Sequence, residues 1–287
     1  MKAFETDLER ALTSFGFVLA IVGTMIALFA GCFTGLHVDM ELVQKEGLSY
    51  GYHWQLLYRG LRSEAFSFAL PVLATLGFGG TYLEEMKSGF YKFAVPRYGR
   101  RNYVVTKIIV GALSGGLSVW IGLILTAILN WAVYAPMEKD MDTALLVEDV
   151  AGIRSAFVKG AIRLADGTIY GVTAEQAAHS NMFLALLQWS ALVFLIGATW
   201  AALGNLFAIL YRNRYMAYGA AFLISYMIII LITRFFKNIY IFNPREWFGQ
   251  TGYWEGGNLG VILFLSECLV MLSLLNTVLM SKRLEAI

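Results

Sequence analysis

Six long apolar blocks constrain this 287-residue sequence more than any other feature. They cover residues 13–33, 65–82, 104–134, 182–210, 216–233 and 259–280. A bilayer core about 30 Å thick is crossed by about 20 helical residues, and lipid requires backbone polar groups to be satisfied within the structure that spans it. The sequence therefore predicts an all-α integral membrane protein with six transmembrane helices, in a single domain over residues 1–287.

The composition agrees with this class of protein. Hydrophobic residues make up 58% of the chain and charged residues 15%, whereas soluble domains are about 45–50% apolar and about 25% charged. The two cysteines, Cys32 and Cys268, both fall inside apolar blocks. Neither a disulfide framework nor a metal cluster is expected from them, and we expect no nucleic-acid partner.

The segments outside the apolar blocks alternate between the two sides of the membrane, and Lys and Arg are concentrated on one of these sides. With the N-terminus inside, the inner segments hold 12 Lys and Arg in 49 residues, and the outer segments hold 10 in a little over 100. Cytoplasmic loops of membrane proteins carry such an excess of Lys and Arg. We expect a multi-pass plasma-membrane protein with both termini in the cytoplasm.

The first twelve residues mix both charges with apolar residues on one helical face. Phe4, Leu8, Ala11 and Leu12 form that face. A cleaved secretory signal instead opens with a basic stretch before its apolar core. We expect residues 1–12 to form an interfacial helix at the cytoplasmic surface; the alternative is a frayed terminus.

The inner segment 83–103 is the most informative part of the sequence. Its acidic pair at 84–85 precedes Lys87 and Lys92, which predicts a helical continuation of the second span. The helix is expected to end near Pro96, because proline and the residue before it disfavour a helix interior. In the simplest interpretation, the basic residues of this segment only anchor it to anionic lipid.

Residues 69–129 resemble the permease subunits of ABC-2-type exporters from Firmicutes. The pattern that carries the resemblance is Leu70-Pro71, then Glu84-Glu85-x-Lys87-Ser88-Gly89, then Arg97-x-x-Arg100-Arg101-x-Tyr103, then Lys107 at the start of the third span, then Ser114-Gly115-Gly116. Within that family the chain is most similar to exporters of phenol-soluble modulins and to lantibiotic-immunity transporters. The resemblance implies six spans, an interfacial N-terminal helix and a cytoplasmic coupling helix.

The resemblance also implies that energy comes from a partner. In such transporters a separate ATPase subunit binds ATP and Mg²⁺ and docks against the segment between spans two and three. The sequence agrees, since it contains no Gly-x-x-x-x-Gly-Lys-Ser/Thr phosphate loop. We expect a permease subunit that is not itself an enzyme and holds no cofactor. The expected docking residues are Glu84, Glu85, Lys87, Phe90, Phe93, Arg97, Arg100 and Arg101.

A second permease copy or paralogue is a further expectation from the resemblance, with spans one and five near the shared axis. There Phe15, Leu19, Phe222 and Tyr226 are expected to line an apolar translocation path. Glu267 lies inside the sixth block, where an unpaired carboxyl costs a few kcal/mol. It is expected to face protein or water, either as part of that path or as a carboxyl that holds helices together.

Small residues recur at helical spacing on two of the blocks. They are Gly111, Gly115 and Gly122 on the third block and Gly197, Ala201 and Gly204 on the fourth. Small residues let transmembrane helices approach closely. The pattern predicts tight helix packing inside the bundle.

Two long segments, 135–181 and 234–258, are expected on the extracellular side. Apolar and basic residues alternate over 153–163 in a pattern that predicts an amphipathic helix, and 165–168 predicts a turn. The many aromatic residues of 234–258 predict a segment that returns to the outer leaflet. Both segments form an outer lid, or they only cover the bundle and anchor it to headgroups.

Export of amphipathic or antimicrobial peptides across the plasma membrane, driven by ATP, is the function we expect. A lantibiotic or bacteriocin immunity permease, or a drug-efflux permease, would share this scaffold. An ion-coupled secondary transporter is a further alternative, with Glu267 as the proton carrier. An intramembrane enzyme is disfavoured, because the three histidines lie in outer segments and no His-Glu-x-x-His motif occurs.

Overall fold

The computed structural model describes residues 2–33, 56–57, 60–77, 81–134, 162–163, 169–170, 182–236, 240–248 and 257–285. Within this part of the chain, six helical segments are long and apolar enough to cross a membrane, as the sequence predicts. They are α2 (Phe15–Phe33), α5 (Glu64–Leu76) with α6 (Thr81–Ser88), α8 (Arg100–Tyr134), α11 (Met182–Tyr211), α12 (Arg214–Phe235) and α13 (Gly257–Glu285). The protein is therefore a multi-pass helical membrane protein.

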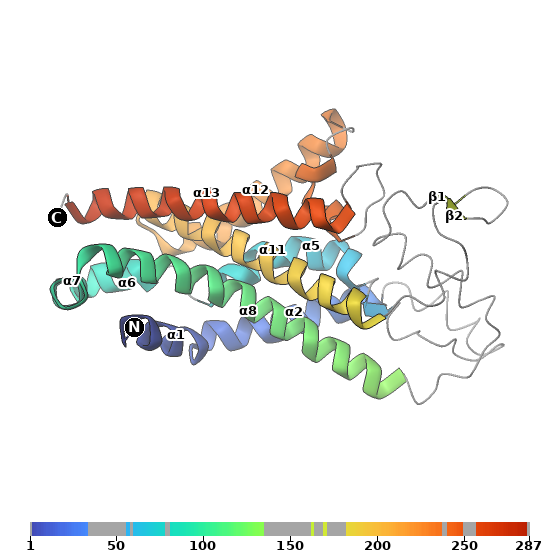
Figure 1. Cartoon of the computed structure of the whole chain (residues 1–287), viewed down its shortest axis with the longest axis horizontal. Helices are drawn as coiled ribbons and strands as arrows, with labels where there is room; N and C mark the ends of the chain where they lie inside the picture. Colours follow the sequence, from blue (N-terminus) through green and yellow to red (C-terminus); the bar gives the residue numbers. More distant parts are fainter. Residues whose placement is uncertain are drawn as a thin grey trace.

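The shorter elements lie at the two ends of the bundle. They are α1 (Lys2–Leu12), α7 (Tyr91–Tyr98), the 3-10 turns η2 (Tyr240–Phe242) and η3 (Pro244–Trp247), and the strands β1 (Ile162–Arg163) and β2 (Ile169–Tyr170). Figure 1 shows α1, α6 and α7 at one end, together with both ends of the chain, and the β1–β2 pair at the other. An even number of spans requires this placement of the chain ends.

Helix α11 is the centre of the bundle. It packs against α5, α8, α12 and α13, and its side chains Trp189, Leu192 and Ile196 are almost completely buried. They join Phe66 of α5 and Leu265 of α13 in one apolar core. Helices α12 and α13 both rest on α11 and keep large apolar side chains exposed on their other sides, as lipid-facing helices do.

Helices α8 and α11 meet through their small residues. A Cβ atom at Gly115 would stand 2.3 Å from the Cβ of Ala201, and one at Gly197 would stand 2.9 Å from the carbonyl oxygen of Gly115. Both distances are shorter than atoms tolerate without a shift of the backbone. The predicted close packing of the third and fourth blocks is confirmed at these residues.

Two glycines divide the segment between α5 and α8, and this corrects the predicted helix end at Pro96. Helix α6 ends at Ser88, followed by Gly89 with φ +76°, and α7 ends at Tyr98, followed by Gly99 with φ +79°. Only glycine adopts such positive φ values without strain. Pro96 instead lies inside α7, so the glycines and not the proline set the helix ends. A Cβ at Gly89 or Gly99 would meet nothing within 4 Å.

The far end of the bundle also differs in part from the prediction. Ile162 and Arg163 belong to strand β1, which pairs antiparallel with β2, so the predicted helix over 153–163 is wrong at these two residues. The rest of that stretch and the predicted turn at 165–168 lie outside the described residues. In the other outer segment, Trp247 and Phe248 are buried in the apolar core, and Arg245 pairs with Glu64 at the start of α5 at 2.9 Å.

Candidate functional site

The α6–α7 hairpin carries most of the expected docking residues on its outer side. Phe93 is 77% exposed and Phe90 is 46% exposed, although both are large apolar side chains. We define the hairpin surface as the exposed members of the expected set, which are Glu84, Lys87, Phe90, Phe93, Arg97 and Arg101. Apart from Glu84, its charges are all positive, and the exposed Lys92 adds another.

The inner side of the hairpin is fixed to the bundle by apolar contacts. Tyr82 and Leu83 of α6 and Ala94 of α7 are buried in a cluster with Ile108 of α8 and Met280 of α13. The same cluster includes residues near the end of α11. The hairpin is therefore part of the packed structure and not a loose connection between two spans.

A buried ionic cluster centred on Glu85 lies beside these contacts. Glu85 Oε1 accepts hydrogen bonds from Lys107 Nζ at 2.6 Å and Arg10 Nη1 at 2.9 Å, and Glu85 Oε2 accepts one from the Tyr103 hydroxyl at 2.7 Å. Lys107 Nζ also donates to Asp7 Oδ1 at 2.7 Å. The Glu85 and Lys107 side chains are only 5% and 4% exposed. We call these five residues the Glu85 cluster.

Burial of Glu85 corrects one of the expected docking residues. Its carboxylate is directed into the protein and is shared among three donors from α1 and α8, so it does not present a charge to a partner. Glu84 is exposed, because neighbouring residues of a helix point to different faces. Glu85 therefore acts inside the chain.

The Glu85 cluster fastens α1 to the hairpin and to α8. Arg10 reaches both parts of the hairpin, because its guanidinium also lies 5.9 Å from the centre of the Phe90 ring. Ala11 of α1 packs against Val110 of α8 behind the charges. Asp7 and Lys107 complete the connection from α1 to α8. Helix α1 is thus part of the same assembly, and the alternative of a frayed terminus is wrong for Lys2–Leu12.

The charges of the Glu85 cluster balance, with two carboxylates and two cations. Removing one partner of a buried ion pair leaves the other charge uncompensated and costs about 3–5 kcal/mol. Sequence reasoning did not assign Asp7, Arg10 or Tyr103 to a site. Lys107 was the residue that could have indicated the cluster, because a lysine at the edge of an apolar block needs an acidic partner or water.

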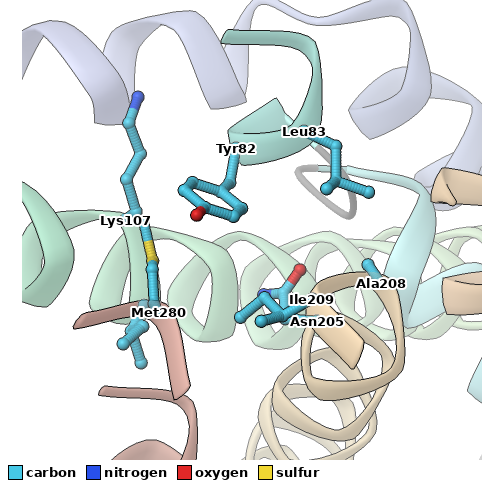
Figure 2. Close-up of a pocket in the computed structure, with 8 residues that line it drawn as sticks. Tyr82, Leu83, Lys107, Asn205, Ala208, Ile209 and Met280 are labelled. Atoms are coloured by element: carbon cyan, nitrogen blue, oxygen red, sulfur yellow. The ribbon is translucent and has the colours of Figure 1, made fainter. Parts of the chain in front are cut away.

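A small cavity of about 20 Å³ lies between α6, α8, α11 and α13, about the space that one water molecule occupies. Figure 2 shows Tyr82 and Leu83 on one side of it and Asn205 and Ile209 of α11 on the other, with the Lys107 amino group directed away from the cavity. The buried Tyr82 hydroxyl has no hydrogen-bond partner among the described residues. The cavity therefore has room for a single water molecule beside the buried Tyr82 side chain.

Arg100 does not belong to the hairpin surface either. Its guanidinium donates to the backbone carbonyl of Ser281 and pairs with Glu285 Oε1 at 2.9 Å. Arg283 donates to the carbonyl of Leu210 at 2.6 Å. These contacts hold the end of α13 against the start of α8 and the end of α11, so the main visible role of Arg100 is inside the chain.

The four residues expected along a translocation path separate into two pairs. Phe222 and Tyr226 of α12 stack on one another with ring centres 6.4 Å apart, and Phe68 of α5 packs against both. Phe15 and Leu19 lie exposed on α2, and α5 contacts both α2 and α12. Phe68 thus joins Phe222 and Tyr226 within one chain, and a lining shared with Phe15 and Leu19 stays a prediction.

Glu267 is exposed on α13, which corrects the expectation that this carboxyl holds helices of the chain together. Helix α13 packs against α11 and α8 through its opposite side. The neighbouring positions Leu263 and Val270 are exposed as well. Within the described part of the chain, the Glu267 carboxyl therefore lies away from the helices that α13 packs against.

No protein-family model, curated protein or solved structure matches the chain. A function is therefore inferred from its residues and their geometry.

Proposed function

We propose that the chain is the transmembrane subunit of an ATP-driven ABC exporter of amphipathic or antimicrobial peptides in the plasma membrane. A second permease copy or paralogue and ATPase subunits that bind ATP and Mg²⁺ complete the transporter. The observation that supports this best is the α6–α7 hairpin. It exposes phenylalanines and cations on its surface, and the buried Glu85 cluster lies between it and the bundle.

The Glu85 cluster gives the hairpin a direct connection to a membrane span. Lys107 belongs to α8, whose 35 residues run from the hairpin to the far end of the bundle. Glu85 belongs to α6, which continues the second span. Displacement of the hairpin by a partner therefore reaches spans two and three together, and a two-state change of the bundle follows from it.

The chemistry of the hairpin surface suits a protein partner. In protein interfaces, aromatic side chains and arginines fill the centre, and charges set orientation and association rate. Phe93 is the most exposed aromatic residue of the hairpin, and Arg97 is exposed on the same short helix. Anionic lipid would attract the same cations, so the test must separate a protein partner from headgroups.

Co-purification with an ABC ATPase subunit provides that test. The double variant Phe93→Glu and Arg97→Glu is expected to lose the ATPase and its ATP hydrolysis, while membrane insertion and thermal unfolding stay unchanged. The matched control is Trp131→Glu, an exposed aromatic residue at the far end of α8. Retention of a fully active ATPase by the hairpin variant would reject the docking surface.

The side of the membrane on which the hairpin lies can be measured independently. In a chain whose two native cysteines are replaced by serine, Phe93→Cys is expected to react with a membrane-impermeant maleimide only in inside-out vesicles. Reaction in right-side-out vesicles would place the hairpin outside the cell and contradict the proposal.

The energy source separates the exporter from an ion-coupled carrier. Liposomes that contain the chain with its ATPase are expected to move a fluorescent amphipathic helical peptide only with ATP and Mg²⁺. Movement by the chain alone under a proton gradient would support the secondary transporter instead.

A further inference from the structure

The half of the bundle away from α1, α6 and α7 contains a large cavity. Its volume is about 500 Å³, within the range of about 300–1,000 Å³ that small-molecule sites occupy. Helices α11, α12 and α13 and the turns η2 and η3 line it, with Trp200, Leu231, Phe242, Trp247, Phe264 and Met271 among its walls. We call it the outer cavity.

The outer cavity has a closed floor and an open side. Its floor is made by Trp200 of α11 and Leu265 of α13, both buried. Leu231 of α12 and Met271 of α13 also line it and are exposed. Since α12 and α13 are membrane-spanning candidates, the open side between them faces the hydrocarbon of the bilayer.

Two polar side-chain groups on its walls already form hydrogen bonds within the chain. The Thr199 hydroxyl donates to the carbonyl of Leu195 at 2.7 Å, and the indole N–H of Trp247 donates to the carbonyl of Ile241 at 2.7 Å. A polar group without a hydrogen bond in such surroundings costs free energy. The occupant therefore presents hydrocarbon to these walls and keeps its polar part outside.

Aromatic contacts hold the walls in place. The ring centres of Trp200 and Trp247 lie 6.3 Å apart, and those of Phe242 and Phe264 lie 5.1 Å apart in an edge-to-face arrangement. Trp247 also contacts Phe264. A preformed site loses little conformational freedom when it binds.

We propose that the outer cavity binds one acyl chain of a membrane amphiphile, which enters sideways between α12 and α13 and leaves its headgroup outside. This goes beyond peptide export and does not depend on an ATPase partner. An amphipathic peptide helix fits less well, because its polar face would find no hydrogen-bonding group in these walls.

Cross-linking in lipid nanodiscs tests the site. The probe is a phosphatidylglycerol with a photoreactive diazirine in one acyl chain, and the attached peptides are mapped by mass spectrometry. We expect cross-links to concentrate on the α12 and α13 segments that contain Leu231 and Met271. The cavity-filling variant Leu203→Trp should reduce them about tenfold, equivalent to roughly 1.4 kcal/mol of binding free energy. The control Val270→Trp, exposed on α13 and outside the cavity, should leave them unchanged.

Cys268 allows a second test that requires no substitution in the cavity walls. It lines the outer cavity, and Cys32→Ser leaves it as the one thiol of the chain. Modification with hexadecyl methanethiosulfonate should place a hydrocarbon chain in the cavity and abolish the cross-links, whereas the methyl reagent should not. Equal effects of both reagents would contradict the proposal.

Two outcomes would overturn the proposal. Cross-links spread evenly over all lipid-facing helices and insensitive to Leu203→Trp would mean ordinary boundary lipid only. Displacement of the cross-links by a saturating amphipathic helical peptide that itself labels the cavity walls would assign the site to a peptide.

Discussion

The two halves of the bundle use their interiors in opposite ways. At the end formed by α1, α6 and α7, paired charges fill the space between helices, and the adjoining cavity measures about 20 Å³. In the other half, apolar walls line an open-sided cavity of about 500 Å³. Paired buried charges fix the geometry of their helices, because each one depends on its partner. The difference separates a region suited to transmit movement from a region suited to hold a ligand.

Breaking the Glu85 cluster should have the largest effect on stability. Lys107→Met removes the ammonium group that donates to both Glu85 and Asp7, and we expect a loss of about 3–5 kcal/mol. Thermal unfolding of the purified protein in detergent measures this loss. The double variant Lys107→Met with Glu85→Gln should recover a large part of it, and an unchanged melting temperature in Lys107→Met would contradict the role of the cluster.

Enlarging a side chain should distinguish the two halves directly. Ala208→Leu adds volume beside the small cavity, where Ala208 is buried, and overpacking of this kind costs about 1–3 kcal/mol. Leu203→Trp adds volume beside the outer cavity and should cost less than about 1 kcal/mol, since the space is already present. Equal destabilisation of the two variants in thermal unfolding would remove the contrast between the halves.

A single hydrogen bond of the Glu85 cluster should have a smaller effect. Tyr103→Phe removes the hydroxyl that donates to Glu85 Oε2, and hydrogen bonds to charged groups contribute about 1.5–3 kcal/mol. We expect the lower end of that range, because Lys107 and Arg10 still pair with the carboxylate. The control is Tyr226→Phe on the exposed side of α12, for which no change in unfolding is expected.

The smallest effect should come from the ion pair of the far end. Arg245 Nη2 and Glu64 Oε1 lie 2.9 Å apart, but the two side chains are 49% and 65% exposed. Exposed pairs contribute about 0.2–1 kcal/mol and weaken with salt, so Arg245→Ala should be nearly silent in 0.5 M salt. A loss as large as that of Lys107→Met would show that burial does not decide the strength of ion pairs in this chain.

The spans were predictable because the length of an apolar run is a property of the sequence alone. The predicted span 216–233 corresponds to α12 at Arg214–Phe235, and 13–33 corresponds to α2 at Phe15–Phe33. Close packing at Gly115 and at Ala201 was also predictable, because small residues repeat at helical spacing on each of their helices, whereas the contact between these two residues comes from the fold. In each case the informative residues are neighbours along one helix.

The sites were less predictable because their parts come from distant positions. Lys107 meets a partner 100 residues away in Asp7 and another 22 residues away in Glu85. The walls of the outer cavity come from three helices and two turns. Glu84 and Glu85 look alike in the sequence, yet their burial differs, because only the packing of α6 decides which one turns inward.

The glycines at both ends of α7 have a chemical consequence. Gly89 and Gly99 have positive φ, and space is open where a side chain would begin. An L-residue at either position is strained by its positive φ, although no atom would lie within 4 Å of its Cβ. At both ends of α7 the requirement for glycine therefore comes from the handedness of the backbone and not from a lack of room for a side chain.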